Sequence, residues 1–152
     1  MTIEALHKLF LQHPQICTDT RHIVQNSLFF ALKGDNFDAN NFASDALKEG
    51  CNYAIVDNPE VARNENYIVV ENVLKTLQEL ANYHRSYCKT KILAITGTNG
   101  KTTTKELIHS VLATTYKTIA TKGNFNNHIG VPLTLLRITE ETEIAIVEMG
   151  AS

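Results

Sequence analysis

Hydrophobic and polar positions along this 152-residue chain follow two different periods, and the changes of period mark the expected elements. Apolar residues at spacings of three and four predict helices, and short apolar runs between turn residues predict buried strands. In the first part the expected helices are 3–10, 42–49 and 72–87, with Asn72 as an N-cap, and the expected strands are 27–32, 53–56 and 67–70. This part is therefore predicted to be α/β.

From residue 92 onward, strands and helices alternate regularly. The expected order is strand 92–96, a Gly-rich turn, helix 102–115, strand 117–121, a loop, a short helix at 132–136 and strand 143–148. This alternation predicts parallel strands joined by right-handed crossovers. A short polar stretch at 88–91 separates the two patterns, so we place a domain boundary there, giving domains 1–88 and 89–152.

Composition narrows the class of protein. With 43% hydrophobic and 20% charged residues the chain can bury a core, and a net charge of −2 provides no basic field for nucleic acid. No apolar run approaches the roughly 20 residues needed for membrane insertion, and residues 1–12 are amphipathic rather than signal-like, so a cytoplasmic address is expected. Cys17, Cys51 and Cys88 form no C-x-x-C pair and are expected to be buried or free thiols.

The main chemical motif is the turn after strand 92–96. Its letters are G-T-N-G-K-T-T, comprising Gly97, Thr98, Asn99, Gly100, Lys101, Thr102 and Thr103. Glycines let backbone N–H groups face a phosphate, the lysine reaches the β and γ phosphates, and the Thr102 hydroxyl suits a magnesium shell. Ile95 stands where the usual motif has its first glycine. The alternative is an ordinary turn in solvent, but the strand before it and the helix behind it favour an ATP site.

Glu148 is the candidate magnesium ligand. It interrupts the apolar run I-A-I-V-E-M-G at the end of the last strand, where ligands bind in parallel sheets. The alternative is a carboxylate that simply reaches the surface as the strand ends. The segment 123–132, rich in Asn and Gly, is expected to be a loop that either presents amides to a ligand or only forms turns.

Three segments together resemble the Mur ligases of peptidoglycan synthesis. They are G-T-N-G-K-T-T, the run A-T-K-G-N-F-N-N-H-I-G-V-P-L-T-L-L at 120–136, and V-E-M-G-A at 147–151. The middle run is most similar to the branch that joins D-alanyl-D-alanine to UDP-N-acetylmuramoyl-tripeptide. The D-T-R at 19–21 and L-F-F-A-L-K-G at 28–34 also resemble segments that hold the UDP end of that substrate.

The resemblance implies a small mixed α/β N-terminal domain followed by the start of a P-loop parallel-sheet ATPase domain. It implies that ATP phosphorylates the peptide carboxylate and that the amine attacks the acyl phosphate, with Lys101 as the catalytic residue and Mg²⁺ on Thr102 and Glu148. It further implies that Asn126 and Asn127 orient ATP or substrate. Thr20 and Arg21 would contact the uridine and diphosphate end.

The sequence also departs from the family pattern. Ala39 follows Asp38 where the family usually has glycine, His128 occupies a variable position, and the family's central domain is expected to continue past Ser152. An incomplete parallel sheet predicts self-association, and the isolated chain is expected to be inactive. Two alternatives stay open: a related amide ligase such as MurE or folylpolyglutamate synthase, and a nucleotide- or UDP-sugar-binding module without turnover.

Overall fold

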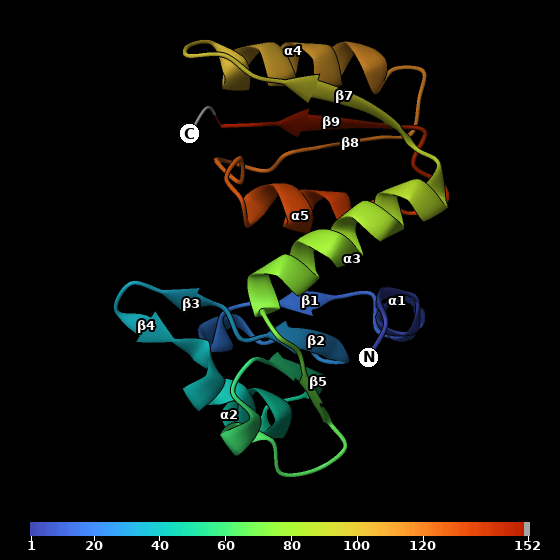
Figure 1. Cartoon of the computed structure of the whole chain (residues 1–152). Coiled ribbons are helices and arrows are strands. Elements are labelled where there is room, and N and C mark those ends of the chain that lie inside the picture. The colour runs from blue at the N-terminus through green and yellow to red at the C-terminus, as the bar shows by residue number, and fades with distance from the viewer. Residues whose placement is uncertain (151–152) are drawn as a thin grey trace. The chain divides into compact units, whose positions relative to one another are not determined.

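A computed structural model of the chain describes residues 1–150 and divides into two compact units, Met1–Leu80 and the part from Ala81 onward. Both are α/β, as predicted, and both contain a parallel sheet, which the sequence pattern predicts only for the second part (Figure 1). The division falls inside the long helix α3 (Val73–Cys88), whereas the sequence pattern places a boundary after that helix. None of the helices within residues 1–150 is long and apolar enough to cross a bilayer.

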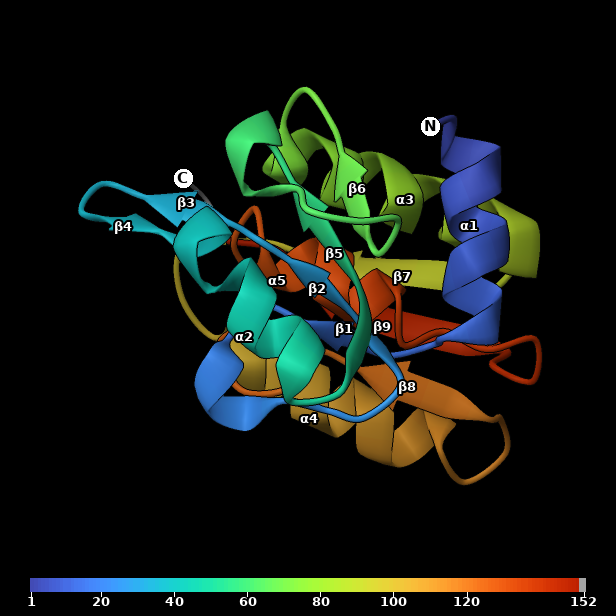
Figure 2. The same ribbon diagram turned by 90° about the horizontal axis from the view of Figure 1, so that it is seen from below.

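The first unit is built on a four-stranded parallel sheet in the order β1-β2-β5-β6. The strands are β1 (Ile16–Cys17), β2 (Ser27–Phe30), β5 (Cys51–Val56) and β6 (Tyr67–Val69), and the helices are α1 (Ile3–Gln12) and α2 (Ala43–Lys48). Short 3-10 turns lie at η1 (Thr20–His22), η2 (Ala39–Phe42) and η3 (Pro59–Val61). A two-stranded antiparallel hairpin, β3 (Lys33–Gly34) with β4 (Phe37–Asp38), projects from this unit (Figure 2).

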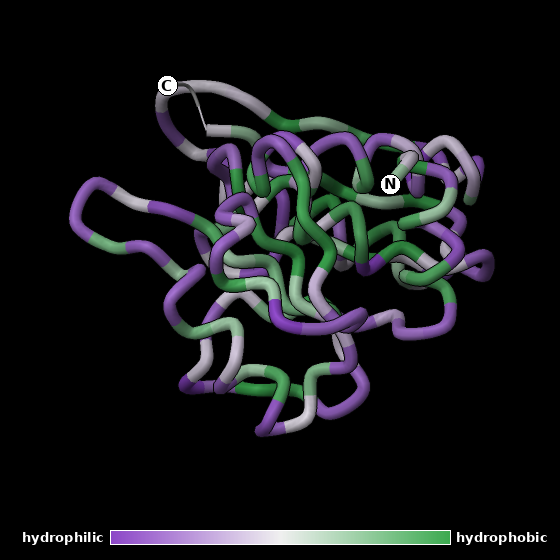
Figure 3. Tube along the Cα trace, turned by 60° about the horizontal axis from the view of Figure 1, so that its bottom comes forward, coloured by the Kyte–Doolittle hydropathy of each residue, from purple (hydrophilic) through white to green (hydrophobic). Residues whose placement is uncertain are grey.

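The apolar run of β2 is buried at every position, as a central parallel strand requires. Phe29 packs in a cluster with Ala43 and Ala46 of α2, while its neighbours Leu28 and Phe30 are also fully buried. Because successive side chains point to opposite faces of a strand, both faces of the sheet are covered at its centre. The outermost turns of the trace are accordingly mostly hydrophilic, and hydrophobic stretches run through its inner part (Figure 3).

The second unit has a three-stranded parallel sheet in the order β7-β9-β8. Its elements are β7 (Lys91–Ile95), α4 (Lys101–Leu112), β8 (Thr118–Ala120), α5 (Gly130–Leu135) and β9 (Ile144–Glu148). Ala145 and Val147 of β9 pack in a core cluster with Ile138, whereas β7 is only half-buried. The central strand therefore carries the core of this unit.

Most expected elements are present, with shifted ends. Asn72 does cap α3, since its Oδ1 accepts from the Lys75 backbone N–H at 2.8 Å. The predicted helix 42–49 is replaced at its start by η2, and β5 begins two residues before the expected strand. The helix predicted to reach residue 115 ends at Leu112, followed by turns. The expectation of free thiols is confirmed, with Cys17 and Cys51 buried and Cys88 half-buried.

Candidate functional site

The turn between β7 and α4 has the backbone of a phosphate-binding loop. Gly97 has a φ of 143° and Gly100 a φ of 76°, both in the left-handed region that favours glycine. Gly100 is the N-cap of α4, and no side chain caps the first N–H groups of this helix. These N–H groups lie at the positive end of the helix dipole, where an anion is stabilised.

The side chains of the loop are placed to meet such an anion. Lys101 opens α4, and its Nζ donates to the Gly97 carbonyl at 2.6 Å, so the ammonium lies over the loop itself. Thr98 and Asn99 are exposed at the tip of the loop, and Thr102 and Thr103 are exposed in the first turn of the helix. A phosphate in this cradle would replace the Gly97 carbonyl as the partner of the Lys101 ammonium.

Glu148 lies directly beside this loop because of the strand register. Ile95, the last residue of β7, pairs with Glu148 across the parallel ladder, and the Met149 backbone N–H donates to the Ile95 carbonyl at 2.8 Å. The Glu148 carboxylate accepts from the Thr102 hydroxyl at 3.2 and 3.1 Å through Oε1 and Oε2. Its side chain is 2% exposed, so within this structure the carboxylate has not simply reached the surface.

The oxygen atoms of Thr102 and Glu148 fit a magnesium ion. Magnesium prefers hard oxygen ligands and is commonly held by one or two carboxylates together with substrate phosphates. Here a hydroxyl and a carboxylate converge at 3.1 Å next to a phosphate loop. Among residues 1–150 no group of three or more His, Cys, Asp or Glu side chains could form a cage for a metal. Phosphate oxygens and water are further ligands that suit such an ion.

Asn126 and Asn127, two of the three asparagines in the loop after β8, differ in placement. The side-chain amide of Asn126 donates to Glu148 Oε1 at 2.8 Å. The backbone carbonyl of Asn126 accepts from the Gly150 backbone N–H at 2.6 Å. Asn127 instead accepts through Oδ1 from the backbone N–H groups of Ile129 and Gly130, at 3.1 and 2.8 Å. The structure thus brings Asn126 to the candidate metal ligand, while Asn127 organises the start of α5.

Sequence reasoning missed Lys105 and Thr121. Lys105, in the second turn of α4, is 0% exposed, and its Nζ donates to the Thr121 carbonyl at 2.7 Å and lies 3.8 Å from Glu148 Oε2. The Thr121 hydroxyl in turn accepts from the Glu148 backbone N–H at 2.9 Å. The helical period is the sequence signal that could have identified Lys105, because Lys105 occupies a position on the inward face of α4 where an apolar residue is expected.

In the first unit, Thr20 and Arg21 form part of η1. Asp19 caps this turn, accepting from the Arg21 backbone N–H at 3.0 Å, and it also accepts from the Arg21 guanidinium at 2.6 Å. The hydrogen bonds from Arg21 lower the pKa of the Asp19 carboxyl. The Arg21 side chain is 83% exposed, so it lies at the surface and can still reach a ligand.

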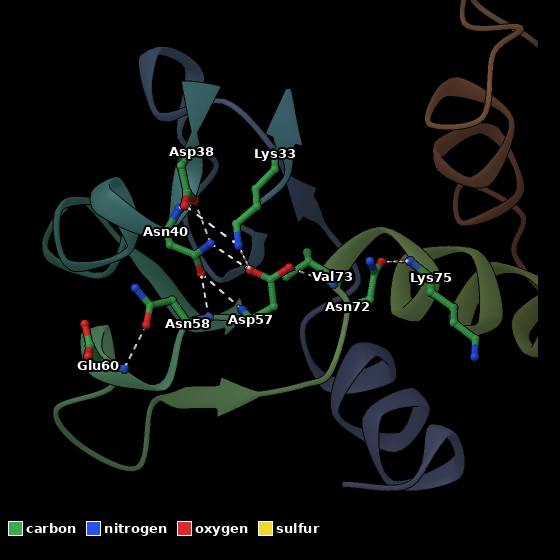
Figure 4. Close-up of polar contacts among 9 residues, drawn as sticks. All are labelled: Lys33, Asp38, Asn40, Asp57, Asn58, Glu60, Asn72, Val73 and Lys75. Carbon is green, nitrogen blue, oxygen red and sulfur yellow. Dashed lines mark hydrogen bonds and ion pairs between the residues drawn. The ribbon is translucent and has the colours of Figure 1, made fainter. Parts of the chain in front are cut away.

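A buried asparagine organises the neighbouring hairpin (Figure 4). Asn40 is 1% exposed, and its amide donates to Asp38 Oδ1 at 2.6 Å and to Asp57 Oδ1 at 2.8 Å. Lys33 of β3 contacts the same Asp57 oxygen at 2.8 Å. Burial raises the pKa of Asp57, but the hydrogen bonds from Lys33 and Asn40 outweigh it, so the pKa is lowered overall. Ala39, where the family has glycine, is buried and has no positive φ.

A family model and several relatives match this chain. Residues 95–152 match the Mur ligase middle domain. The UDP-N-acetylmuramoyl-tripeptide–D-alanyl-D-alanine ligase of Bacillus subtilis is 45% identical over 139 residues, which is 90% of this chain and 30% of the relative. The ligase of the same name from Haemophilus influenzae is 42% identical, over 93% of this chain and 32% of the relative.

Solved structures agree with the sequence matches. A crystal structure of MurF from Acinetobacter baumannii has a TM-score of 0.82 and 41% identity, covering 90% of this chain and 30% of that one. MurF ligase from Thermotoga maritima in complex with ADP has a TM-score of 0.83 and 30% identity, covering 93% and 33%. The resemblance inferred from the motifs is confirmed. The chain spans about 30% of the length of the curated relatives it matches.

Proposed function

We propose that this chain, a member of the Mur ligase family, provides the ATP site and the UDP-substrate site of an enzyme that joins D-alanyl-D-alanine to UDP-N-acetylmuramoyl-tripeptide. The observation that carries the proposal is the contact between Thr102 and Glu148 at 3.1 Å, beside a loop with left-handed glycines. A phosphate loop and a carboxylate on the neighbouring strand form an arrangement suited to phosphoryl transfer. The ligases named above and the ADP complex support it.

The proposed chemistry relies on positioning and charge rather than on a protein nucleophile. Lys101 and the N–H groups of the loop would bind the phosphates of ATP, with Thr98, Asn99 and Thr103 around them. Thr102 and Glu148 would hold Mg²⁺, which when bound neutralises charge on the transferred phosphoryl group. Asn126 would keep the Glu148 carboxylate oriented through its 2.8 Å bond.

The proposed UDP-substrate site lies in the first unit. Thr20 and Arg21 would contact the uridine and diphosphate of the UDP-linked tripeptide, because the Arg21 guanidinium is exposed and geometrically suited to phosphate. Asn127 would act on the ligands only indirectly, by shaping the loop before α5. A cytoplasmic address, expected from the sequence, belongs to this proposal as well.

Calorimetric titration tests both sites in one chain. Mg-ATP binding should fall at least about 10-fold in Lys101→Ala and stay within about twofold in Lys91→Ala, which removes an exposed lysine at the other end of β7. Binding of the UDP-linked tripeptide should fall similarly in Arg21→Ala but not in Arg63→Ala, an exposed arginine of the same unit. If Lys101→Ala and Arg21→Ala bind their ligands as well as the unmodified chain does, the assignment of these sites is refuted.

We expect the 152-residue chain by itself to bind both ligands without joining them, since it spans about 30% of the length of its relatives. The measurement is release of phosphate and formation of the ligated product when ATP and both substrates are supplied. Ligation by the isolated chain would contradict this expectation.

Self-association of the chain is also proposed. In the part of the chain that the structure describes, β7 pairs only with β9, so its other edge carries unpaired backbone groups. On the outer side of α4, Leu107 and Val111 are 63% and 68% exposed. Sedimentation velocity over a range of concentrations should show a dimer or larger species that Val111→Lys weakens. A monomer at all concentrations would refute the proposal.

A further inference from the structure

Lys105 is a buried cation next to the candidate metal ligand. It is 0% exposed, while the Glu148 side chain 3.8 Å away is 2% exposed. The 2.7 Å bond to the Thr121 carbonyl fixes the position of the ammonium. A buried lysine is rare unless it is paired, so its charge needs an explanation within this site.

The charges around Glu148 nearly cancel before any ligand arrives. Thr102 and Asn126, which both donate to the carboxylate, are neutral. Glu106 also contacts Lys105, at 3.0 Å, but its side chain is 63% exposed and water screens its charge. Within residues 1–150, the buried charged groups of the site are therefore one negative group, Glu148, and one positive group, Lys105.

A divalent cation alone gains little from such a pair. The carboxylate attracts such a cation, the ammonium 3.8 Å from the carboxylate repels it, and burial leaves both effects only weakly screened. A nucleotide changes this balance, because its phosphates add negative charge and hard oxygen ligands on the loop side of the site.

We propose that Lys105 is a specificity residue that keeps free divalent cations off Glu148, so that the site takes up its metal only together with the phosphates of a nucleotide. The inference rests on the proposed ATP site and adds an order of binding to it. Lys105 acts through Glu148 and does not itself touch the nucleotide in this proposal, so it is a positioning residue rather than a catalytic one.

The test uses Mn²⁺ as the probe, with free Mn²⁺ followed by electron paramagnetic resonance. The unmodified chain should bind Mn²⁺ weakly alone and much more tightly when ADP is present. Lys105→Met, which keeps the length of the side chain and removes its charge, should bind Mn²⁺ without nucleotide at least about 10-fold more tightly than the unmodified chain. The double variant Lys105→Met with Glu148→Gln should lose this gain.

Glu106→Gln is the matched control, because it removes the exposed acid that contacts Lys105 and leaves the buried pair intact. It should change Mn²⁺ binding by less than about twofold. Lys105→Gln, which retains a donor for the Thr121 carbonyl, provides a second uncharged variant, and circular dichroism shows whether each variant is folded.

The outcomes separate this inference from the proposed function. Failure of the unmodified chain to bind Mn²⁺ with ADP would count against the ATP site itself. Tight binding of Mn²⁺ alone to the unmodified chain, abolished by Glu148→Gln, would leave the ATP site standing and overturn the role of Lys105. The role of Lys105 would also be overturned if folded Lys105→Met and Lys105→Gln chains bind free Mn²⁺ no better than the unmodified chain.

Discussion

Replacing Asn40 by alanine should locally destabilise the first unit by about 3 kcal/mol. The side chain is 1% exposed, and its Oδ1 accepts from the backbone N–H groups of Asp57 and Asn58 at 3.1 and 3.3 Å. Alanine leaves both N–H donors without this acceptor, which costs about 1–1.5 kcal/mol of stability for each donor. It also removes the side-chain amide that donates to the carboxylates of Asp38 and Asp57. Lys33 still contacts Asp57, so that carboxylate keeps one partner.

Hydrogen exchange followed by mass spectrometry measures this effect in each unit separately, which matters because two units need not unfold together. Peptides covering β5 should exchange about 100-fold faster in Asn40→Ala, the factor that corresponds to about 3 kcal/mol. Peptides covering β9, in the other unit, should be unchanged. The control is Asn41→Ala, at the exposed neighbouring position, with an effect within about 0.5 kcal/mol. Equal exchange in the two variants would refute the role of the buried network.

Two further predictions concern the second unit. Burial lowers the pKa of His84 although its Nε2 bonds the Ile138 carbonyl at 2.8 Å, so stability should be lost as pH falls below the unfolded value of about 6.5. His84→Gln should remove this slope, at most about 1.4 kcal/mol per pH unit, and an unchanged slope in urea titrations from pH 7 to 5 would contradict the assignment. Gly130→Ala should destabilise by about 2 kcal/mol, because a Cβ there would lie 2.4 Å from the Phe125 backbone. Gly34→Ala, where no atom lies within 4 Å of the added Cβ, serves as its control in the same thermal-unfolding assay.

The strongly patterned elements could be predicted from the sequence. The apolar run of β2, the amphipathic pattern of α3 and the strand–turn–helix around the phosphate loop each carry their signal within one local window. β1 and the β3–β4 hairpin were not predicted, because strands of two residues are too short to show a period. Their pairing depends on partners elsewhere in the chain.

The candidate site was predictable where a residue's type and its place in an element were enough. Lys101 and Thr102 follow from the motif, and Glu148 from its place at a strand end. The role of Lys105 does not follow from the local pattern, because its contacts are with Thr121 and Glu148, 16 and 43 positions further along the chain. The different placements of Asn126 and Asn127 could not be read from two identical side chains in one loop.

Strand register is what converts these separate residues into one site. Glu148 reaches Thr102 because β9 pairs with β7 so that Ile95 lies opposite Glu148. Side chains alternate between the faces of a strand, so a slip of one residue would turn the carboxylate to the opposite face and bring a neighbour beside the loop. That neighbour would be buried Val147 or exposed Met149, neither of which offers an oxygen ligand. The buried apolar residues that precede Glu148 in β9, Ala145, Ile146 and Val147, therefore determine the site as much as the carboxylate does, because their burial fixes the register that places it.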